Sequence, residues 1–179
     1  MGLYKSFWGY ALALPAVVVV LDQLTKKWAT GLFDLPFNIC EIDPYVGNKG
    51  YFQDFSPIVD WAMTCNLGVS FGLLAGDSPA KRWGLTIFAT LMVLAMLVFL
   101  SKTAEKWTRV GLGFIIGGAV GNGIDRFMHG AVTDFVSVGD LLPFFPWVFN
   151  VADSAITIGV MFIALDMFLE WRREKATKS

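Results

Sequence analysis

Long apolar stretches separated by polar loops dominate this chain and predict four membrane-spanning helices. A helix needs roughly 20 mostly apolar residues to cross a bilayer. Stretches of this kind occur at about residues 7–26, 83–101, 110–126 and 150–171, and the second contains no charged residue. Runs such as residues 16–21 lack the alternation of apolar and polar positions that a membrane β-barrel requires, so we expect helices.

A long segment, about residues 28–81, separates the first two predicted spans and exceeds the length of an ordinary connection. It contains four prolines and many aromatic residues. Because amphipathic aromatic side chains favour the membrane–water interface, we expect this segment to fold against the membrane surface. Within it, we interpret residues 58–64 as a short β-strand.

The composition supports a membrane protein and argues against several other classes. Hydrophobic residues make up 55% of the 179 residues and charged residues only 16%, whereas a soluble domain is roughly 25% charged. A soluble globule of this size could not bury such an excess of apolar surface. A net charge of −1 argues against a nucleic-acid partner, and two cysteines cannot form a disulfide framework or a structural zinc site.

The basic residues predict which side of the membrane each end faces. They cluster at 102–109 and 172–178, and short basic loops face the cytoplasm, so we expect both termini to lie inside. The first apolar run follows Lys5 as in a secretory signal, but no small-x-small cleavage site comes after it. We therefore expect a retained first span within one membrane domain, residues 1–179.

Four aspartates gather at the predicted outer ends of these spans. Asp22 lies late in the first span, Asp125 late in the third and Asp153 early in the fourth. Asp134 lies in the outer loop between the third and fourth spans. Ionisable residues at membrane depth are costly and are therefore candidates for function.

Each of these positions also has an ordinary structural explanation. Asp22 and Lys26, four residues apart on a helix, could form a simple ion pair. Asn150 and Asp153 are typical of a helix N-cap and first turn, and Arg126 could extend to the interface. Because these explanations would have to place four carboxylates at one leaflet independently, the cluster favours a functional site.

The chemistry that best fits the cluster is a pair of aspartates sharing one proton. His129 is the single histidine, but no Gly-x-Ser-x-Gly motif accompanies it, and no His-rich or Cys-rich ligand set indicates a metal. Two carboxyl groups a few ångströms apart cannot both ionise. The ionised one can take a proton from water while the protonated one donates a hydrogen bond to a carbonyl. This is aspartic-peptidase chemistry, which needs no cofactor.

Four sequence blocks, in this order, resemble the lipoprotein signal peptidase (signal peptidase II) family. They are Leu-Asp-Gln-Leu-Thr-Lys at 21–26, an Asn-x-Gly-x-x-Phe block at 66–72, residues 117–126 followed by Val-Thr-Asp-Phe at 132–135, and Phe-Asn-Val-Ala-Asp within 149–156. Each block alone is a weak or moderate signal. Together they cover most of the chain and are highly specific.

The resemblance implies an enzyme of the bacterial inner membrane with its active site at the outer leaflet. Such an enzyme removes signal peptides from prolipoproteins, cutting before a cysteine that carries diacylglycerol, and is inhibited by globomycin-type peptides. The implied catalytic residues are Asp134 and Asp153. The implied site-shaping residues are Asn66, Asn122, Asp125, Arg126 and Asn150, with Asp22 and Lys26 as structural support.

The same resemblance implies an all-α membrane protein with a small extracytoplasmic β-sheet, beginning at Asn66, that cradles the substrate. We expect a monomer embedded in membrane lipid. Residues near 37–60 have no counterpart in the family's pattern. Cys40 and Cys65 both fall on the oxidising side, so a disulfide is possible. We expect two free thiols, because Cys65 adjoins Asn66.

Other interpretations fit less well. An ion-coupled transporter would show inverted repeats or a chain of acids across the bilayer, but all the acids except Asp166 gather at one predicted face. A non-catalytic scaffold leaves the aspartate cluster unexplained. A presenilin-type protease would carry Gly-x-Gly-Asp, and residues 121–125 miss that spacing by one. The spacing of Gly117 and Gly121 favours close helix packing rather than a functional role.

Overall fold

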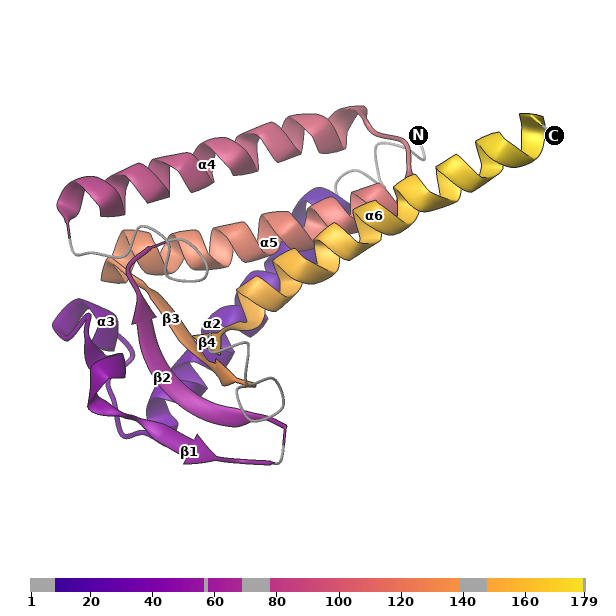
Figure 1. The fold of residues 1–179 in the computed structure, drawn as a ribbon. Helices are drawn as coiled ribbons and strands as arrows, with labels where there is room; N and C mark the ends of the chain where they lie inside the picture. Colours follow the sequence, from indigo (N-terminus) through magenta and orange to yellow (C-terminus); the bar gives the residue numbers. More distant parts are fainter. Residues whose placement is uncertain (1–8, 57, 69–77, 139–147, 179) are drawn as a thin grey trace.

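The protein is built from long helices with a four-stranded antiparallel sheet at one end, as a computed structural model shows (Figure 1). The structure describes residues 9–56, 58–68, 78–138 and 148–178. The long helices are α2 (Leu14–Leu32), α4 (Pro79–Lys102), α5 (Lys106–His129) and α6 (Val151–Lys178). A short π-helix, η1 (Gly9–Ala13), precedes α2. The predicted mostly helical fold with a small sheet is confirmed.

Each predicted span corresponds to one long helix, but the bounds differ most for the first. The predicted stretch ended near residue 26, whereas α2 continues for another one and a half turns to Leu32. Its last turns are held in place because Ala29 and Thr30 are buried beneath the sheet. The start of the predicted first span, residues 7 and 8, lies outside the described residues.

Two of the four helices, α4 and α6, are long and apolar enough to qualify as membrane spans by composition within the described part of the chain. α2 carries Asp22, Lys26 and Lys27, and α5 combines many glycines with Arg109 and Asn122. These polar residues lower the apolar content of α2 and α5. Composition alone therefore does not identify α2 and α5 as spans.

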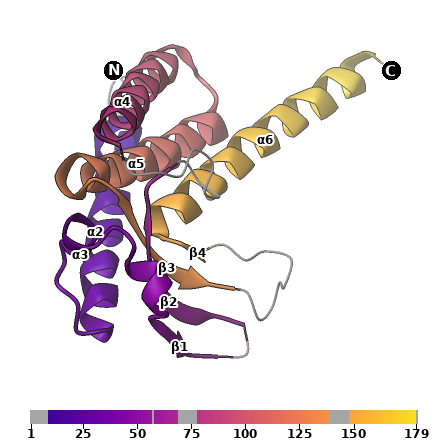
Figure 2. The ribbon, with the colours of Figure 1, turned by 60° about the vertical axis from the view of Figure 1, so that its left-hand side comes forward.

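The helices alternate in direction relative to the sheet. α2 and α5 run toward the sheet and α4 and α6 run away from it, and α6 extends past the other helices at the opposite end (Figures 1 and 2). α5 lies in the middle and packs against α2, α4 and α6. The ends of α2 and α5 and the start of α6 therefore meet beside the sheet.

Glycines let α5 approach its neighbours closely on two faces. A Cβ at Gly111 would lie 2.5 Å from the carbonyl oxygen of Gly159 on α6, and one at Gly118 would collide with the carbonyl of Ala152. On the face toward α2, a Cβ at Gly117 would lie 2.7 Å from the Val18 Cβ. These contacts confirm that the glycines of this helix serve packing.

We expect Gly118→Ala to destabilise the protein by about 1–3 kcal/mol, because the added methyl meets backbone that cannot rotate away. Gly123→Ala is the matched control on the same helix, since a Cβ there meets nothing within 4 Å. The control should be neutral or stabilising by about 0.5–1 kcal/mol. Equilibrium unfolding in detergent would measure both, and equal stability of the two variants would contradict this account of packing.

The sheet has the strand order β1-β2-β3-β4, and all neighbours are antiparallel. The strands are β1 (Phe52–Asp54), β2 (Asp60–Asn66), β3 (Val132–Ser137) and β4 (Val148–Phe149). The strand predicted at 58–64 is confirmed as β2. Asn66 ends this strand, so the expectation that it begins the sheet segment is wrong, and residues 69–77 lie outside the described residues.

Residues 37–60 fold over one face of the sheet and supply its edge strand. This segment forms α3 (Ile39–Ile42), the 3₁₀ turn η2 (Val46–Lys49) and β1. Its buried residues share one apolar core with the strands and the end of α2, and this core contains Ala29, Ile39, Cys40, Val46, Met63, Ala131 and Phe135. The segment therefore completes the sheet's core.

Cys40 and Cys65 form a disulfide, so the expectation of two free thiols is wrong. α3 folds back across β2, which brings two residues 25 positions apart to a Cα–Cα distance of 5.6 Å. Adjacency to Asn66 does not prevent the bond, because successive side chains of a strand point to opposite faces. Cys65 faces α3 while Asn66 faces the aspartates described below.

Candidate active site

The aspartates that the sequence singled out come together where α2, α5, α6 and β3 meet. Asp22 and Asp125 lie on facing turns of α2 and α5, Asp134 lies on β3, and Asp153 lies in the first turn of α6. Three of them are almost completely buried, and Asp153 is half-buried. They form two groups, one around Asn150 and one around Lys26.

Asp134 is held on the sheet by two asparagine side chains. Asn66 Nδ2 donates to Asp134 Oδ2 at 3.2 Å, and Asn150 Nδ2 donates to Oδ1 at 2.6 Å. Asn66 pairs with Val132 across the β2–β3 ladder, so Asp134 is its diagonal neighbour on the same face. Asp134 is only 1% exposed.

Asp153 is fixed by a capping box at the start of α6. Its backbone N–H donates to Asn150 Oδ1 at 2.9 Å, and the Asn150 N–H donates back to Asp153 Oδ2 at 3.3 Å. The predicted N-cap is therefore present. The other carboxylate oxygen, Oδ1, accepts a hydrogen bond of 2.8 Å from Asn122 Nδ2 on α5.

Asn150 contacts both acids, because its side-chain nitrogen donates to the Asp134 carboxylate and its backbone N–H donates to the Asp153 carboxylate. The side-chain nitrogen also lies 3.1 Å from Asn122 Oδ1 and 3.2 Å from the Thr133 carbonyl oxygen. Asn150 is completely buried. One residue thus starts α6 and sets the positions of two acids.

Burial raises the pKa of Asp134 well above its usual range, and the negative charge of Asp153 raises it further. The charge of Lys26 and the hydrogen bonds from Asn66 and Asn150 lower the pKa but do not outweigh burial. Asp134 therefore holds its proton more tightly than an aspartate in water does.

The raised pKa of Asp134 predicts that the protein loses stability as the pH rises. The folded state binds this proton more tightly than the unfolded chain does, so the contribution to stability is complete below the unfolded value of about 4. This contribution is lost as the pH rises from there through the folded-state pKa.

Unfolding measured across this pH range should show a weaker pH dependence in Asp134→Asn than in the wild type. The control is Asp54→Asn, an exposed aspartate on β1. An unchanged slope in Asp134→Asn would contradict the assignment.

Lys26 is the centre of the second group and is completely buried. Its Nζ lies 2.8 Å from Asp22 Oδ2, 2.8 Å from Asp125 Oδ2 and 3.2 Å from Asn122 Oδ1. The three N–H bonds of an ammonium group are thus matched by three acceptors. The simple Asp22–Lys26 pair of the sequence interpretation is one part of a network that joins α2 to α5.

The two carboxylates on Lys26 also bind backbone amides of other elements. Asp22 Oδ1 accepts the Ala152 N–H at the start of α6 at 3.0 Å. Asp125 Oδ2 accepts the Thr133 N–H of β3 at 3.1 Å. This group therefore fixes α6 and β3, the two elements that carry Asp153 and Asp134.

Sequence reasoning missed Gln23, which belongs to the group around Lys26. Its Nε2 donates to Asp125 Oδ1 at 2.8 Å, to Asp22 Oδ2 at 3.2 Å and to the Gly121 carbonyl at 3.4 Å. Its position within the 21–26 block was a usable signal. A polar residue next to Asp22 in an apolar helix requires a partner.

Two other candidates lie at the edge of the site. Arg126 Nη2 donates to the Gly68 carbonyl oxygen at 2.6 Å, so this side chain reaches across to the residues that follow β2. Its buried Nε has no hydrogen-bond partner within the described residues. His129, one turn further along α5, is buried against Phe37 with the ring centroids 5.4 Å apart and does not contact the aspartates described above.

Comparisons with known proteins point in one direction. The family described as signal peptidase (SPase) II matches residues 14–169 of the chain. A lipoprotein signal peptidase of Caulobacter vibrioides is 42% identical over 160 residues, covering 89% of this chain and 86% of the relative. One of Pseudomonas putida is 35% identical over 166 residues, covering 91% of this chain and 89% of the relative.

Solved structures of two bacterial membrane enzymes share the fold. One has a TM-score of 0.72 at 25% identity and covers 90% of this chain and 89% of the other. The second has a TM-score of 0.67 at 28% identity and covers 89% and 92% of the two chains. The likeness therefore extends over nearly the whole chain.

Proposed function

Because this chain belongs to the lipoprotein signal peptidase (signal peptidase II) family, a family of membrane enzymes that remove signal peptides from lipoproteins, we propose that it is an aspartic endopeptidase whose catalytic pair is Asp134 and Asp153. Its substrates are prolipoproteins modified with diacylglycerol, cut on the N-terminal side of the lipidated cysteine. The observation that carries the proposal is that both carboxyl groups accept hydrogen bonds from one residue, Asn150: Asp134 from its side-chain nitrogen and Asp153 from its backbone N–H.

The unequal surroundings of the two acids support different roles. Asp134 is buried and its pKa is raised, so it holds the proton and donates it to the scissile carbonyl oxygen. Asp153 is half-buried, which leaves it open to water and substrate. It takes a proton from the attacking water as the water oxygen bonds to the carbonyl carbon. The C–N bond then breaks as Asp153 passes that proton to the leaving amine and Asp134 takes its proton back from a hydroxyl of the tetrahedral intermediate, which leaves a carboxylic acid.

The neighbouring polar residues position these two acids and the peptide. Asn66, Asn122 and Asn150 direct the carboxyl groups through the hydrogen bonds described above. Arg126 has a buried Nε without a partner in the described chain, which suits it to a carbonyl oxygen of the substrate. Asp22, Lys26 and Asp125 hold the elements together. This chemistry uses no cofactor or metal, because the two carboxyl groups and water supply every proton that moves.

The proposal includes four spans, α2, α4, α5 and α6, in the bacterial inner membrane, with both termini inside and the site at the outer leaflet. Large apolar side chains on the outward faces of three helices support it, among them Val17, Leu24, Leu91, Val98, Val160 and Phe168. The basic clusters lie at the ends away from the sheet, as the rule for cytoplasmic loops requires. The exposed Trp28, Phe52 and Phe55 fit the membrane interface.

A cleavage assay with matched substrates tests the proposed specificity. Purified protein in detergent would receive a diacylglyceryl-modified prolipoprotein and its unlipidated precursor. We expect cleavage of the lipidated form alone, inhibition by a globomycin-type peptide, and activity that co-elutes with the monomer. Cleavage of both forms at similar rates would contradict the substrate assignment, and no cleavage by a folded protein would contradict the activity.

A further inference from the structure

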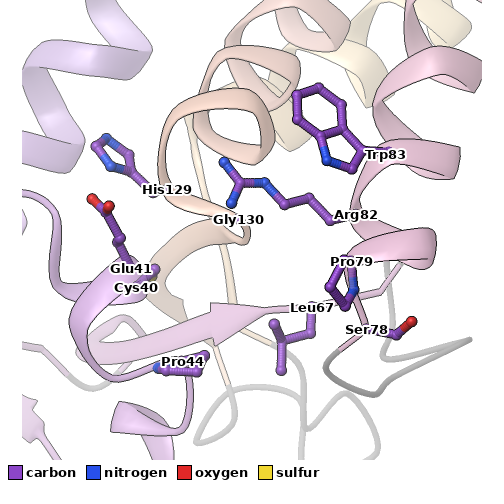
Figure 3. Close-up of a pocket in the computed structure, with 10 residues that line it drawn as sticks. All are labelled: Cys40, Glu41, Pro44, Leu67, Ser78, Pro79, Arg82, Trp83, His129 and Gly130. Carbon is purple, nitrogen blue, oxygen red and sulfur yellow. The ribbon is translucent and has the colours of Figure 1, made fainter.

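A pocket lies beside the sheet, separate from the aspartates. It has a volume of about 200 Å³ and lies between α3, the start of α4 and the end of α5 (Figure 3). The side chains that matter for its chemistry are Glu41, Ser78, Arg82, Trp83 and His129. None of these takes part in the proposed peptidase mechanism.

His129 indicates that this pocket is built for a ligand. Its side chain is 8% exposed, and neither ring nitrogen has a hydrogen-bond partner within the described residues. Leaving a buried polar group unsatisfied is costly, so such groups normally have a partner. The ring lines the pocket and packs edge-on against Phe37. A ligand with a hydrogen-bonding group would satisfy it.

One side of the pocket is positively charged. The Arg82 guanidinium extends from α4 toward the end of α5, where Nε donates to the Arg126 carbonyl at 2.9 Å and Nη2 donates to the Phe127 carbonyl (Figure 3). α4 begins at Pro79 beside the pocket, and no side chain caps it. The N-terminus of a long helix carries partial positive charge and free N–H groups. Arg82, His129 and this helix start together suit a phosphate.

The opposite side carries a carboxylate. Glu41, exposed on α3, also lines the pocket, and it accepts a long hydrogen bond of 3.4 Å from Asn38 Nδ2 (Figure 3). A small cavity lined by both an acid and an arginine disfavours a simple anion and favours a ligand with charges of both signs. We propose that the pocket binds a phosphoethanolamine group, with the phosphate on Arg82 and His129 and the ammonium on Glu41.

A membrane lipid is the favoured source of this group. Trp83 is exposed at the mouth of the pocket, and the exposed Ile87 and Leu91 continue along α4 away from it. Acyl chains could lie along this face while tryptophan occupies the headgroup level. The choice of lipid rests on the membrane placement proposed above, but the headgroup chemistry does not. A diacylglyceryl group on a prolipoprotein has no phosphate, so this ligand is distinct from the substrate.

The single histidine gives a direct test. Full-length protein labelled with ¹⁵N only in histidine would be titrated in detergent with short-chain phosphatidylethanolamine, and the imidazole resonances of His129 followed. We expect a saturable shift at a concentration at least about tenfold lower than for phosphatidylcholine or phosphatidylglycerol of equal chain length. Soluble phosphoethanolamine and inorganic phosphate are the headgroup-only probes.

Glu41→Gln should abolish the tenfold preference for phosphatidylethanolamine over phosphatidylglycerol. Glu170→Gln, an exposed glutamate on α6, is the matched control and should keep it. No shift with any phosphate compound would overturn the site. An equal response to both lipids in the wild type would overturn the role of Glu41, and tighter binding of soluble phosphoethanolamine would overturn the lipid source. Cleavage of the lipidated substrate is measured in a separate assay, so a negative lipid-binding result would not contradict the peptidase assignment.

Discussion

Replacing Asp134 by asparagine should lower kcat/KM for the lipidated substrate by about a thousandfold or more while leaving the protein folded. The amide has nearly the same shape, but its single carbonyl oxygen can replace only one of the two oxygens that accept from Asn66 and Asn150, and it cannot supply the proton. Cleavage rates in detergent, together with thermal unfolding of the same preparation, would separate lost chemistry from lost structure.

Asp153→Asn should cause a loss of similar size, and the double variant should lose little more than either single one. Residues that act as one catalytic unit are not additive in their effects. Asp54→Asn, an exposed aspartate on the edge strand β1, is the control and should retain full activity. Near-normal cleavage by Asp134→Asn would overturn the two-aspartate mechanism.

Lys26→Met should destabilise the protein by about 3–5 kcal/mol, the typical cost of removing one partner of a buried ion pair. Two carboxylates, Asp22 and Asp125, would then face each other in a buried site without their shared cation. Because these acids hold the start of α6 and the start of β3, activity should be lost with stability. Unfolding in detergent and the cleavage assay would report the two effects.

Lys27→Met is the matched control, since Lys27 is the next residue on α2 and is exposed. It should change stability by less than about 0.5 kcal/mol. A second comparison adds Asp22→Asn to Lys26→Met, which removes the repulsion and should recover part of the lost stability. Equal stability of Lys26→Met and Lys27→Met would contradict the stabilising role of the network around Lys26.

The helices could be predicted because each coincides with a long, mostly apolar run, and a run of roughly 20 such residues indicates a helix that could cross a membrane. The aspartate cluster could be predicted for the same reason, since a charge such as Asp22 inside an apolar run has few ordinary explanations. The strand at 58–64 was also recognisable. The precise extent of α2 was not, because its last turns are stabilised by Ala29 and Thr30 packing under the sheet, a contact that spacing along the chain does not reveal.

The remaining misses share a physical cause, which is dependence on contacts distant in sequence. Gln23 matters because Asp125 lies opposite it on another helix. The Cys40–Cys65 bond depends on α3 folding across β2, and nothing in the composition of residues 37–60 predicts that return. Asn150 was correctly interpreted as a helix cap, but its second bond, to Asp134, became visible only with the sheet in place.

The hydrogen bond from the Ala152 N–H to Asp22 has a consequence for biosynthesis. It joins the first long helix to the last, and the capping box that orients Asp153 forms only where α6 begins. A nascent chain that has made α2, α4, α5 and β3 therefore holds Asp134 but lacks Asp153. Under the proposed mechanism, we expect such a chain to be inactive until α6 has docked.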